Sequence, residues 1–199
     1  MHVNNFEQLY KFIKHHTFFK DNDFLLGEII KRRKDNPNIV KDNYVCVHYF
    51  IKSIDDLKNK EHDIISICDA LNARFYINPN VKNFKNVTME CLGEFQKILV
   101  SEKYNTIKKL VTGTSSRSIT RQNDIWLVDI DEDMLDKEDE IIQTINSLRP
   151  VGDKILDRFE TNSGCHLLTR KFDSKSFDDV DDYKTVEVKR NSPTLIYYK

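Results

Sequence analysis

The chain has 199 residues, of which 39% are hydrophobic and 32% are charged, and its formal net charge is −1. This length and composition are typical of one soluble globular domain with a sizeable core. A net charge near zero argues against a protein that coats nucleic acid nonspecifically, because such proteins carry a strong basic excess. It leaves room for a local basic groove.

No apolar run approaches the roughly 20 residues that a membrane-spanning helix needs. The first residues lack the apolar stretch of a signal peptide. Four cysteines stand mostly within apolar runs and have no CxxC spacing; they are Cys46, Cys68, Cys91 and Cys165. We therefore expect buried, reduced thiols, no zinc site and a cytoplasmic location.

Apolar residues at helical spacing predict a helix near the N-terminus and a second short helix soon after it. The residues are Phe6, Leu9, Tyr10 and Ile13 for the first, and Phe24, Leu25 and Ile29 for the second. The basic run 31–34 (Lys-Arg-Arg-Lys) follows the second helix. One interpretation is a solvated helix end whose cations suit the helix dipole. The other is a contact to a phosphate backbone.

Residues 44–51 are rich in Val, Tyr and Phe and predict a buried strand. Ser53 suits the N-cap of the next helix, with Asp56 at the capping-box position. Residues 74–77 predict another strand, so strand, helix and strand form a βαβ-like unit. A long helix follows, in which we expect these side chains to face inward: Met89, Leu92, Phe95, Ile98 and Leu99.

Residues 112–123 are small and polar, which is typical of a mobile loop. The segment leads directly into an apolar strand at 126–131, which would place Arg117 and Arg121 near that strand. An ordinary linker loop is an equal alternative. Residues 136–148 then predict a helix whose isoleucines face inward.

Three further segments complete the chain. Residues 154–160 and 166–172 predict a pair of strands around a turn. The acidic run 173–182 predicts a solvated excursion. Residues 186–189 and 194–198 predict a terminal strand pair.

The strand at 126–131 (Trp-Leu-Val-Asp-Ile-Asp) carries two carboxylates at alternate positions. In a strand, Asp129 and Asp131 leave on the same face. Two carboxylates placed this way can share a divalent cation, which prefers hard oxygen ligands. Burying such a pair is unfavourable unless a cation or hydrogen bonds compensate for it. The alternative is that both residues only end the strand and enter the acidic pair 132–133.

A small turn at 161–164 stands directly before the next apolar strand. Gly164 would let the backbone approach a phosphate closely. Ser163 and His166 can donate hydrogen bonds to a phosphate, although a lone histidine is more often a core residue. Arg170 has the strand parity of His166, so it either reaches the same face or is a surface charge.

A third acid, Glu187, lies between two valines near the end of the chain, again in a strand pattern. Lys189 shares its parity and has the same two interpretations as Arg170.

In this order, the three motifs resemble those of the archaeo-eukaryotic primase (primase-polymerase) superfamily. Its catalytic core has a strand with two alternating aspartates, a strand with a small residue and a histidine, and a late strand with one acid. Here these motifs are 128–131, 163–166 and 186–187. The third acid is Glu187 where aspartate is usual, and the sequence stops soon after that strand, so we expect no separate helical priming domain.

The chain also looks like small proteins of tailed phages across nearly its whole length, including the end at 191–198. That resemblance implies a location in the host cytoplasm.

The primase resemblance implies an α+β fold in a single domain, with a mixed or antiparallel sheet and packed helices. Residues 112–199 would form a primase-polymerase-like (RRM-like) catalytic core, and residues 1–111 an N-terminal α/β elaboration. Mg²⁺ or Mn²⁺ would be held by the catalytic acids, which are Asp129, Asp131 and Glu187. Nucleoside triphosphate would be bound by Ser163, Gly164 and His166, with Arg170 and Lys189 added by strand parity. A single-stranded DNA or RNA template would be the further partner.

The leading hypothesis is therefore a metal-dependent nucleotidyltransferase of DNA replication. Three alternatives stay open: a nucleotide- or nucleic-acid-binding module that keeps the fold without turnover, a metal-dependent nuclease, and a structural protein whose acids are incidental. Glu187 and the absence of a basic excess favour the binding module. A triphosphate pocket would favour the polymerase class over the nuclease.

Overall fold

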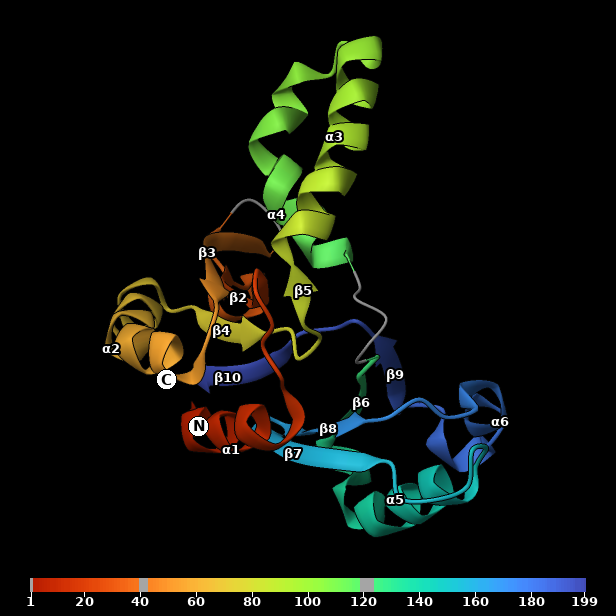
Figure 1. The fold of residues 1–199 in the computed structure, drawn as a ribbon. Coiled ribbons are helices and arrows are strands. Elements are labelled where there is room, and N and C mark those ends of the chain that lie inside the picture. The colour runs from red at the N-terminus through yellow and green to blue at the C-terminus, as the bar shows by residue number, and fades with distance from the viewer. Residues whose placement is uncertain (1, 40–42, 119–123) are drawn as a thin grey trace.

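The computed structural model describes residues 2–39, 43–118 and 124–199 and forms an α+β fold with two antiparallel sheets (Figure 1). The strands are β1 (Val3–Asn4), β2 (Asp23–Lys31), β3 (Tyr44–Ile51), β4 (Arg74–Ile77), β5 (Lys82–Asn83), β6 (Trp126–Asp131), β7 (Ile155–Thr161), β8 (Gly164–Thr169), β9 (Glu187–Arg190) and β10 (Thr194–Tyr198). The α-helices are α1 (Phe6–His16), α2 (Ile54–Leu71), α3 (Phe84–Ser101), α4 (Leu110–Arg117), α5 (Glu138–Ser147) and α6 (Ser174–Asp178). The 3-10 turns are η1 (Arg33–Asp35), η2 (Tyr104–Lys109), η3 (Glu132–Lys137) and η4 (Asp181–Tyr183). Among the described residues, every helix is too short or too polar to span a membrane.

The first sheet has the order β1-β10-β4-β2-β3, with β5 also paired to β2. The prediction of a helix at Phe24, Leu25 and Ile29 is wrong, because these residues lie on the central strand β2. All three are buried. A continuous apolar run covered on both faces shows no strand alternation, so its pattern cannot be told from that of a buried helix.

The predicted βαβ-like unit is confirmed by β3, α2 and β4. The Ser53 hydroxyl accepts a hydrogen bond from the Asp56 backbone N–H at 3.0 Å, so Ser53 caps α2 as expected. Strand β2 pairs antiparallel with both β3 and β4 and lies between them. Helices α1 and α2 contribute to a core that also contains Leu127, Phe159 and Leu168 of the second sheet, so both sheets share it.

The second sheet has the order β7-β8-β6-β9. Helix α5 connects β6 to β7, and α6 connects β8 to β9, which gives a β-α-β-β-α-β order with split βαβ units. The strand with the two aspartates, β6, is therefore central. The acidic run 173–182 is not merely a solvated excursion, because Phe177 of α6 is buried in the core of this sheet.

The predicted pairing of residues 186–189 with 194–198 is wrong. Strand β9 joins the second sheet beside β6, whereas β10 joins the first sheet between β1 and β4. The chain crosses from one sheet to the other at residues 191–193, and Asn191 adopts a positive φ of 50° there. The C-terminal part that bears the motifs thus supplies a strand to the N-terminal sheet.

Residues 84–117, which we call the arm, form an antiparallel pair of helical segments that projects away from both sheets (Figure 1). Most of the α3 side chains expected to face inward are exposed instead: Met89, Leu92, Phe95 and Leu99. Only Ile98 of that set is buried. The predicted loop at 112–123 is also partly wrong, because residues 112–117 belong to α4 and residues 119–123 lie outside the described residues.

A fully buried lysine, Lys82, anchors the base of the arm. Its ammonium donates to the Ser118 carbonyl at 2.7 Å and to Asn191 Oδ1 at 3.2 Å. Burial lowers the pKa of Lys82 from 10.5 to about 8, although Glu28 and Glu90 oppose the shift. The end of the arm is thereby joined to the crossing between the sheets.

The pKa of Lys82 makes the stability of the fold depend on pH. Above pH 8 the folded protein releases this proton, while the unfolded chain keeps it up to about pH 10.5. The unfolded state then binds more protons, so Lys82 adds about 1 kcal/mol to the free energy of unfolding between pH 7 and pH 9. The raised pKa values of buried Cys68 and Cys165 act in the opposite direction above pH 9.

The test therefore compares how the free energy of unfolding changes with pH in the wild type and in a Lys82→Met variant. Urea unfolding at pH 7 and pH 9 should show the wild type gaining stability relative to Lys82→Met. A difference that stays constant between these pH values would contradict the assignment.

Candidate functional site

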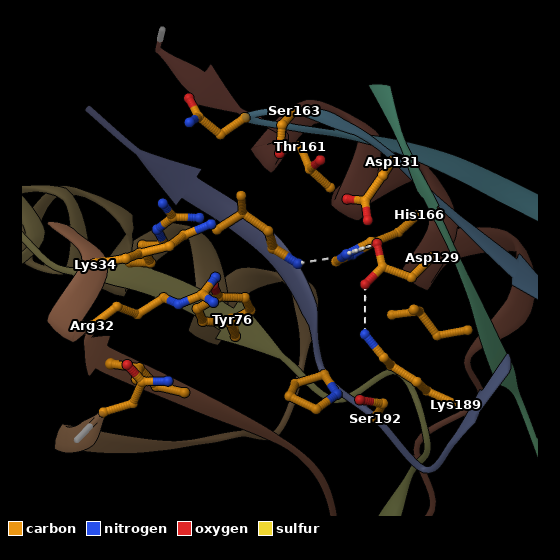
Figure 2. A pocket seen from close by; sticks show the side chains of 17 residues that line it. Arg32, Lys34, Tyr76, Asp129, Asp131, Thr161, Ser163, His166, Lys189 and Ser192 are labelled. Atoms are coloured by element: carbon orange, nitrogen blue, oxygen red, sulfur yellow. Dashed lines mark hydrogen bonds and ion pairs between the residues drawn. The ribbon is translucent and has the colours of Figure 1, made fainter. Parts of the chain in front are cut away.

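A cavity of about 470 Å³, which we call the cleft, opens between the two sheets (Figure 2). The first sheet and its loops contribute Ile30, Arg32, Lys34, Asn43, Arg74, Tyr76 and Leu195; the second sheet and its loops contribute Leu127, Asp129, Asp131, Thr161, Asn162, Ser163, His166 and Lys189; Ser192 and Pro193 come from the crossing. Figure 2 shows Arg32 and Lys34 on one side and Asp129, Asp131 and His166 on the other. The cleft therefore has a basic wall and a wall of motif residues.

Asp129 is the centre of the motif wall. It lies opposite His166 on β8 and opposite Glu187 on β9, so the three motifs meet on neighbouring strands. Its Oδ1 is 3.3 Å from His166 Nε2, and its Oδ2 is 2.5 Å from Lys189 Nζ. Each carboxylate oxygen thus has a cationic or hydrogen-bonding partner, which compensates for its partial burial.

These contacts fix the charge of Asp129. Burial alone would raise its pKa, but the hydrogen bonds from His166 and Lys189 outweigh burial and hold the pKa well below its usual range. Burial would likewise lower the pKa of Lys189, but its contacts to Asp129 and Glu187 raise it. Both groups are therefore ionised at neutral pH.

His166 is oriented by the first sheet. The Leu195 backbone N–H on β10 donates to His166 Nδ1 at 3.4 Å, and the Thr194 hydroxyl lies 2.9 Å from the same nitrogen. Because Nδ1 accepts, Nε2 carries the proton and faces Asp129. His166 is thus a positioned donor at the cleft rather than a histidine enclosed in the core.

Asp131 leaves β6 on the same face as Asp129 and also lines the cleft. Its side chain is exposed and forms no ion pair or hydrogen bond with the described residues. Burial and the nearby Arg32 and Arg74 lower the pKa of Lys34 across the cleft, while the charge of Asp131 opposes that shift. Asp131 is therefore a carboxylate available to a ligand.

Glu187 adjoins the cleft without lining it. The Lys189 ammonium contacts both Glu187, at 2.6 Å, and Asp129, at 2.5 Å, so it lies where a cation shared by these two acids would lie. Within the described ranges, no group of three or more His, Cys, Asp or Glu side chains is arranged to hold a metal ion. Asp129 and Asp131 offer hard oxygens on one strand face, the ligand type that divalent cations prefer. Both oxygens of Asp129 already have partners, so a cation shared by Asp129 with Asp131 or Glu187 would require Lys189 to move.

The basic wall comes from the end of β2 and from β4. Arg74 is held by two hydrogen bonds of 2.7 Å to Asp35 and stacks over the Tyr198 ring at 4.3 Å. Arg32 donates to the Tyr76 hydroxyl at 3.3 Å. Since Asp35 neutralises Arg74, the positive charge left for a ligand comes from Arg32 and Lys34.

The interpretation of the basic run 31–34 as a helix end is wrong, since the run follows the strand β2. The interpretation as a phosphate contact stays a prediction. Sequence reasoning did not single out Arg74 and Tyr76. Their alternate positions on β4 give both the same strand face, and that parity was the available signal.

The predicted site residues divide into two groups. Asp129, Asp131, Ser163, His166 and Lys189 line the cleft. Glu187, Gly164 and Arg170 do not; Arg170 is exposed beyond the end of β8. Arg117 lies on the arm, and Arg121 lies outside the described residues.

Gly164 has a structural reason to be glycine. It is buried with φ +147°, and a Cβ at this position would lie 2.0 Å from the Ile130 carbonyl oxygen. Gly164 therefore allows β8 to approach β6, rather than opening its backbone to the cleft.

Comparisons of the chain with protein-family models, with curated proteins and with solved structures find no match. The geometry of the cleft is therefore the basis for proposing a function.

Proposed function

We propose that this protein is a primase-polymerase-like nucleotidyltransferase that binds nucleoside triphosphate and Mg²⁺ or Mn²⁺ in the cleft. The observation that carries the proposal is the meeting of Asp129, Asp131 and His166 opposite a wall with Arg32 and Lys34. The β-α-β-β-α-β order of the second sheet supports it, because it is the RRM-like layout that the motif resemblance implies.

The two walls of the cleft together offer groups for the phosphates of a triphosphate and for its bound metal ion. A triphosphate carries several negative charges, and charge-assisted hydrogen bonds from arginine, lysine and histidine are its strong contacts. Arg32, Lys34 and His166 supply such donors from both walls, with Ser163 beside them. This provision for a polyphosphate favours nucleotidyl transfer over a nuclease.

In nucleotidyl transfer, a 3′-hydroxyl oxygen forms a bond to the α-phosphorus and loses its proton to water, and the bond from that phosphorus to the leaving diphosphate breaks. Asp129 and Asp131 would hold the divalent cation, which when bound neutralises charge on the reacting oxygens. His166 Nε2–H would donate to a phosphate oxygen, and Lys189 would exchange Asp129 for the triphosphate. Asp129, already ionised, needs no deprotonation before it binds a cation.

The binding module remains the second candidate, and the observation that favours it is Lys189. An ammonium that neutralises Asp129 and Glu187 together makes this part of the site stable without a metal. In that case the cleft would bind nucleotide without transferring it.

His166→Ala should weaken binding of nucleoside triphosphate by one to two orders of magnitude in the presence of Mn²⁺. The reason is the loss of one charge-assisted contact, which contributes about 1.5–3 kcal/mol. The measurement is a calorimetric titration, with His62→Ala as the matched control because the His62 side chain is 92% exposed and lies outside the cleft.

Extension of a primer on a single-stranded template with Mn²⁺, measured beside this titration, separates the two candidates. Binding with product supports the transferase, and binding without product supports the module. A folded wild-type protein that neither binds nor extends would overturn both.

A further inference from the structure

The arm carries a net positive charge that has no role in the proposed function of the cleft. Residues 84–117 include six basic and three acidic residues, in a chain whose net charge is −1. The arm is therefore positive, by about three charges, on a protein that is otherwise acidic.

The positive charge gathers in a groove along one side of the arm. This groove, of about 630 Å³, lies between α3 and the η2–α4 segment. Its basic residues are Lys97, Lys103, Lys109 and Arg117, and among the described residues Glu94 is the single acid that lines it. Lys97 pairs with Glu94 at 2.8 Å, whereas the other three cations form no ion pair with the described residues.

Polar groups line the groove beside these cations, and the arm also exposes two aromatic rings. Ser101, Asn105 and Thr106 also line the groove. Tyr104 and Phe95 of the arm are 54% and 39% exposed. Neither of these two residues is among those that line the groove. Cations that follow a groove can track a nucleic-acid backbone, and exposed aromatic rings can stack with bases.

The base of the arm is connected to the rim of the cleft. The side-chain amide of Asn191 donates to the Ser116 carbonyl at 2.9 Å, and Asn191 also accepts from Lys82. The next two residues of the crossing, Ser192 and Pro193, line the cleft. The base of the arm is therefore attached to the segment that forms part of the cleft wall.

We propose that the groove of the arm binds the phosphate backbone of single-stranded nucleic acid. Binding of nucleic acid in the groove does not depend on catalysis in the cleft. The role of the bound nucleic acid as a template rests on the proposed function. The three unpaired cations, Lys103, Lys109 and Arg117, supply the contacts. Since they neutralise phosphates and release counterions, binding weakens as salt rises.

The test compares two triple variants of the full chain with equal loss of charge. The first is Lys103→Ala with Lys109→Ala and Arg117→Ala; the control is Lys11→Ala with Lys14→Ala and Lys175→Ala, all of which are exposed and lie outside the arm. Fluorescence anisotropy with a labelled 20-nucleotide oligothymidine should show at least about tenfold weaker binding by the arm variant at low salt, and a salt dependence reduced by about 2 in slope. The control variant should bind as the wild type does.

Two further measurements keep the result interpretable. Circular dichroism should show the wild-type fold in the arm variant, and nucleoside triphosphate should still bind in its cleft, so that failure of the groove and failure of the cleft are distinguishable. Equal losses in both triple variants, or no loss in the arm variant, would overturn the proposal. So would unchanged oligothymidine binding together with lost binding to anionic lipid vesicles, because the arm would then be a membrane contact.

Discussion

Asp131→Ala should reduce nucleotidyl transfer by about three orders of magnitude, because a divalent cation stabilises the charge of the transition state by several kcal/mol. The folded structure should survive, since the Asp131 side chain is exposed and makes no hydrogen bond or ion pair with the described residues. The measurement is the rate of primer extension with Mn²⁺, beside a thermal melt.

The matched control is Asp133→Ala, an exposed acid two residues further on that does not line the cleft. It should extend primers at the wild-type rate. Without nucleotide, Mn²⁺ should raise the melting temperature of the wild type and of Asp133→Ala, because a ligand of the folded state stabilises it. Asp131→Ala should lack that rise. Undiminished extension by Asp131→Ala would remove this residue from the catalytic set.

Gly164→Ala should destabilise the protein by about 3–5 kcal/mol, because it combines a strained positive φ with a clash that separates two central strands. The added Cβ would meet the Ile130 carbonyl oxygen at 2.0 Å and the Asp131 Cα at 3.0 Å, and both of these are backbone atoms. Neither can move without shifting β6. Urea unfolding would show the effect as a lower midpoint at an unchanged slope.

Gly93→Ala is the control for this substitution. Gly93 lies in α3, and a Cβ there would meet nothing within 4 Å. Alanine is the better helix former by up to about 1 kcal/mol, so this variant should be slightly more stable than the wild type. A Gly164→Ala protein as stable as the wild type would show that β6 and β8 are not packed as closely as described.

Local sequence patterns predicted the structure correctly at positions where local interactions determine it. The alternation of Asp129 and Asp131 placed both on one strand face, and both line the cleft. The spacing of Ser53 and Asp56 predicted the cap of α2. The small turn before His166 predicted the β7–β8 hairpin, which the register of these strands confirms.

Non-local interactions decided the rest. The sequence of β2 predicted a helix because its apolar residues do not alternate with polar ones. They do not alternate because residues distant in sequence cover both faces of the strand. The side chains of α3 have an amphipathic pattern, but in the part of the chain that the structure describes no element covers Met89 or Leu92. The basic run reaches the cleft only because β10 leaves the motif-bearing half and pairs with β4, which brings the two sheets together.

The part of the site that sequence could not predict is the pairing of charges. Strand parity placed Lys189 on the face of Glu187, but it could not show that this ammonium would contact Asp129 as well. The length and direction of a lysine side chain depend on its neighbours across the sheet, and those neighbours are known only once the strand order is known.

The most direct test of the cleft is a crystal structure of the protein with a non-hydrolysable nucleoside triphosphate and Mn²⁺. The position of the Mn²⁺ ion would be determined by its anomalous scattering. The account predicts a Mn²⁺ peak bound by Asp129 and Asp131, with the triphosphate between His166 and the wall of Arg32 and Lys34, and with Lys189 turned from Asp129 toward phosphate. Nucleotide bound on another surface, or Mn²⁺ bound away from both aspartates, would contradict it.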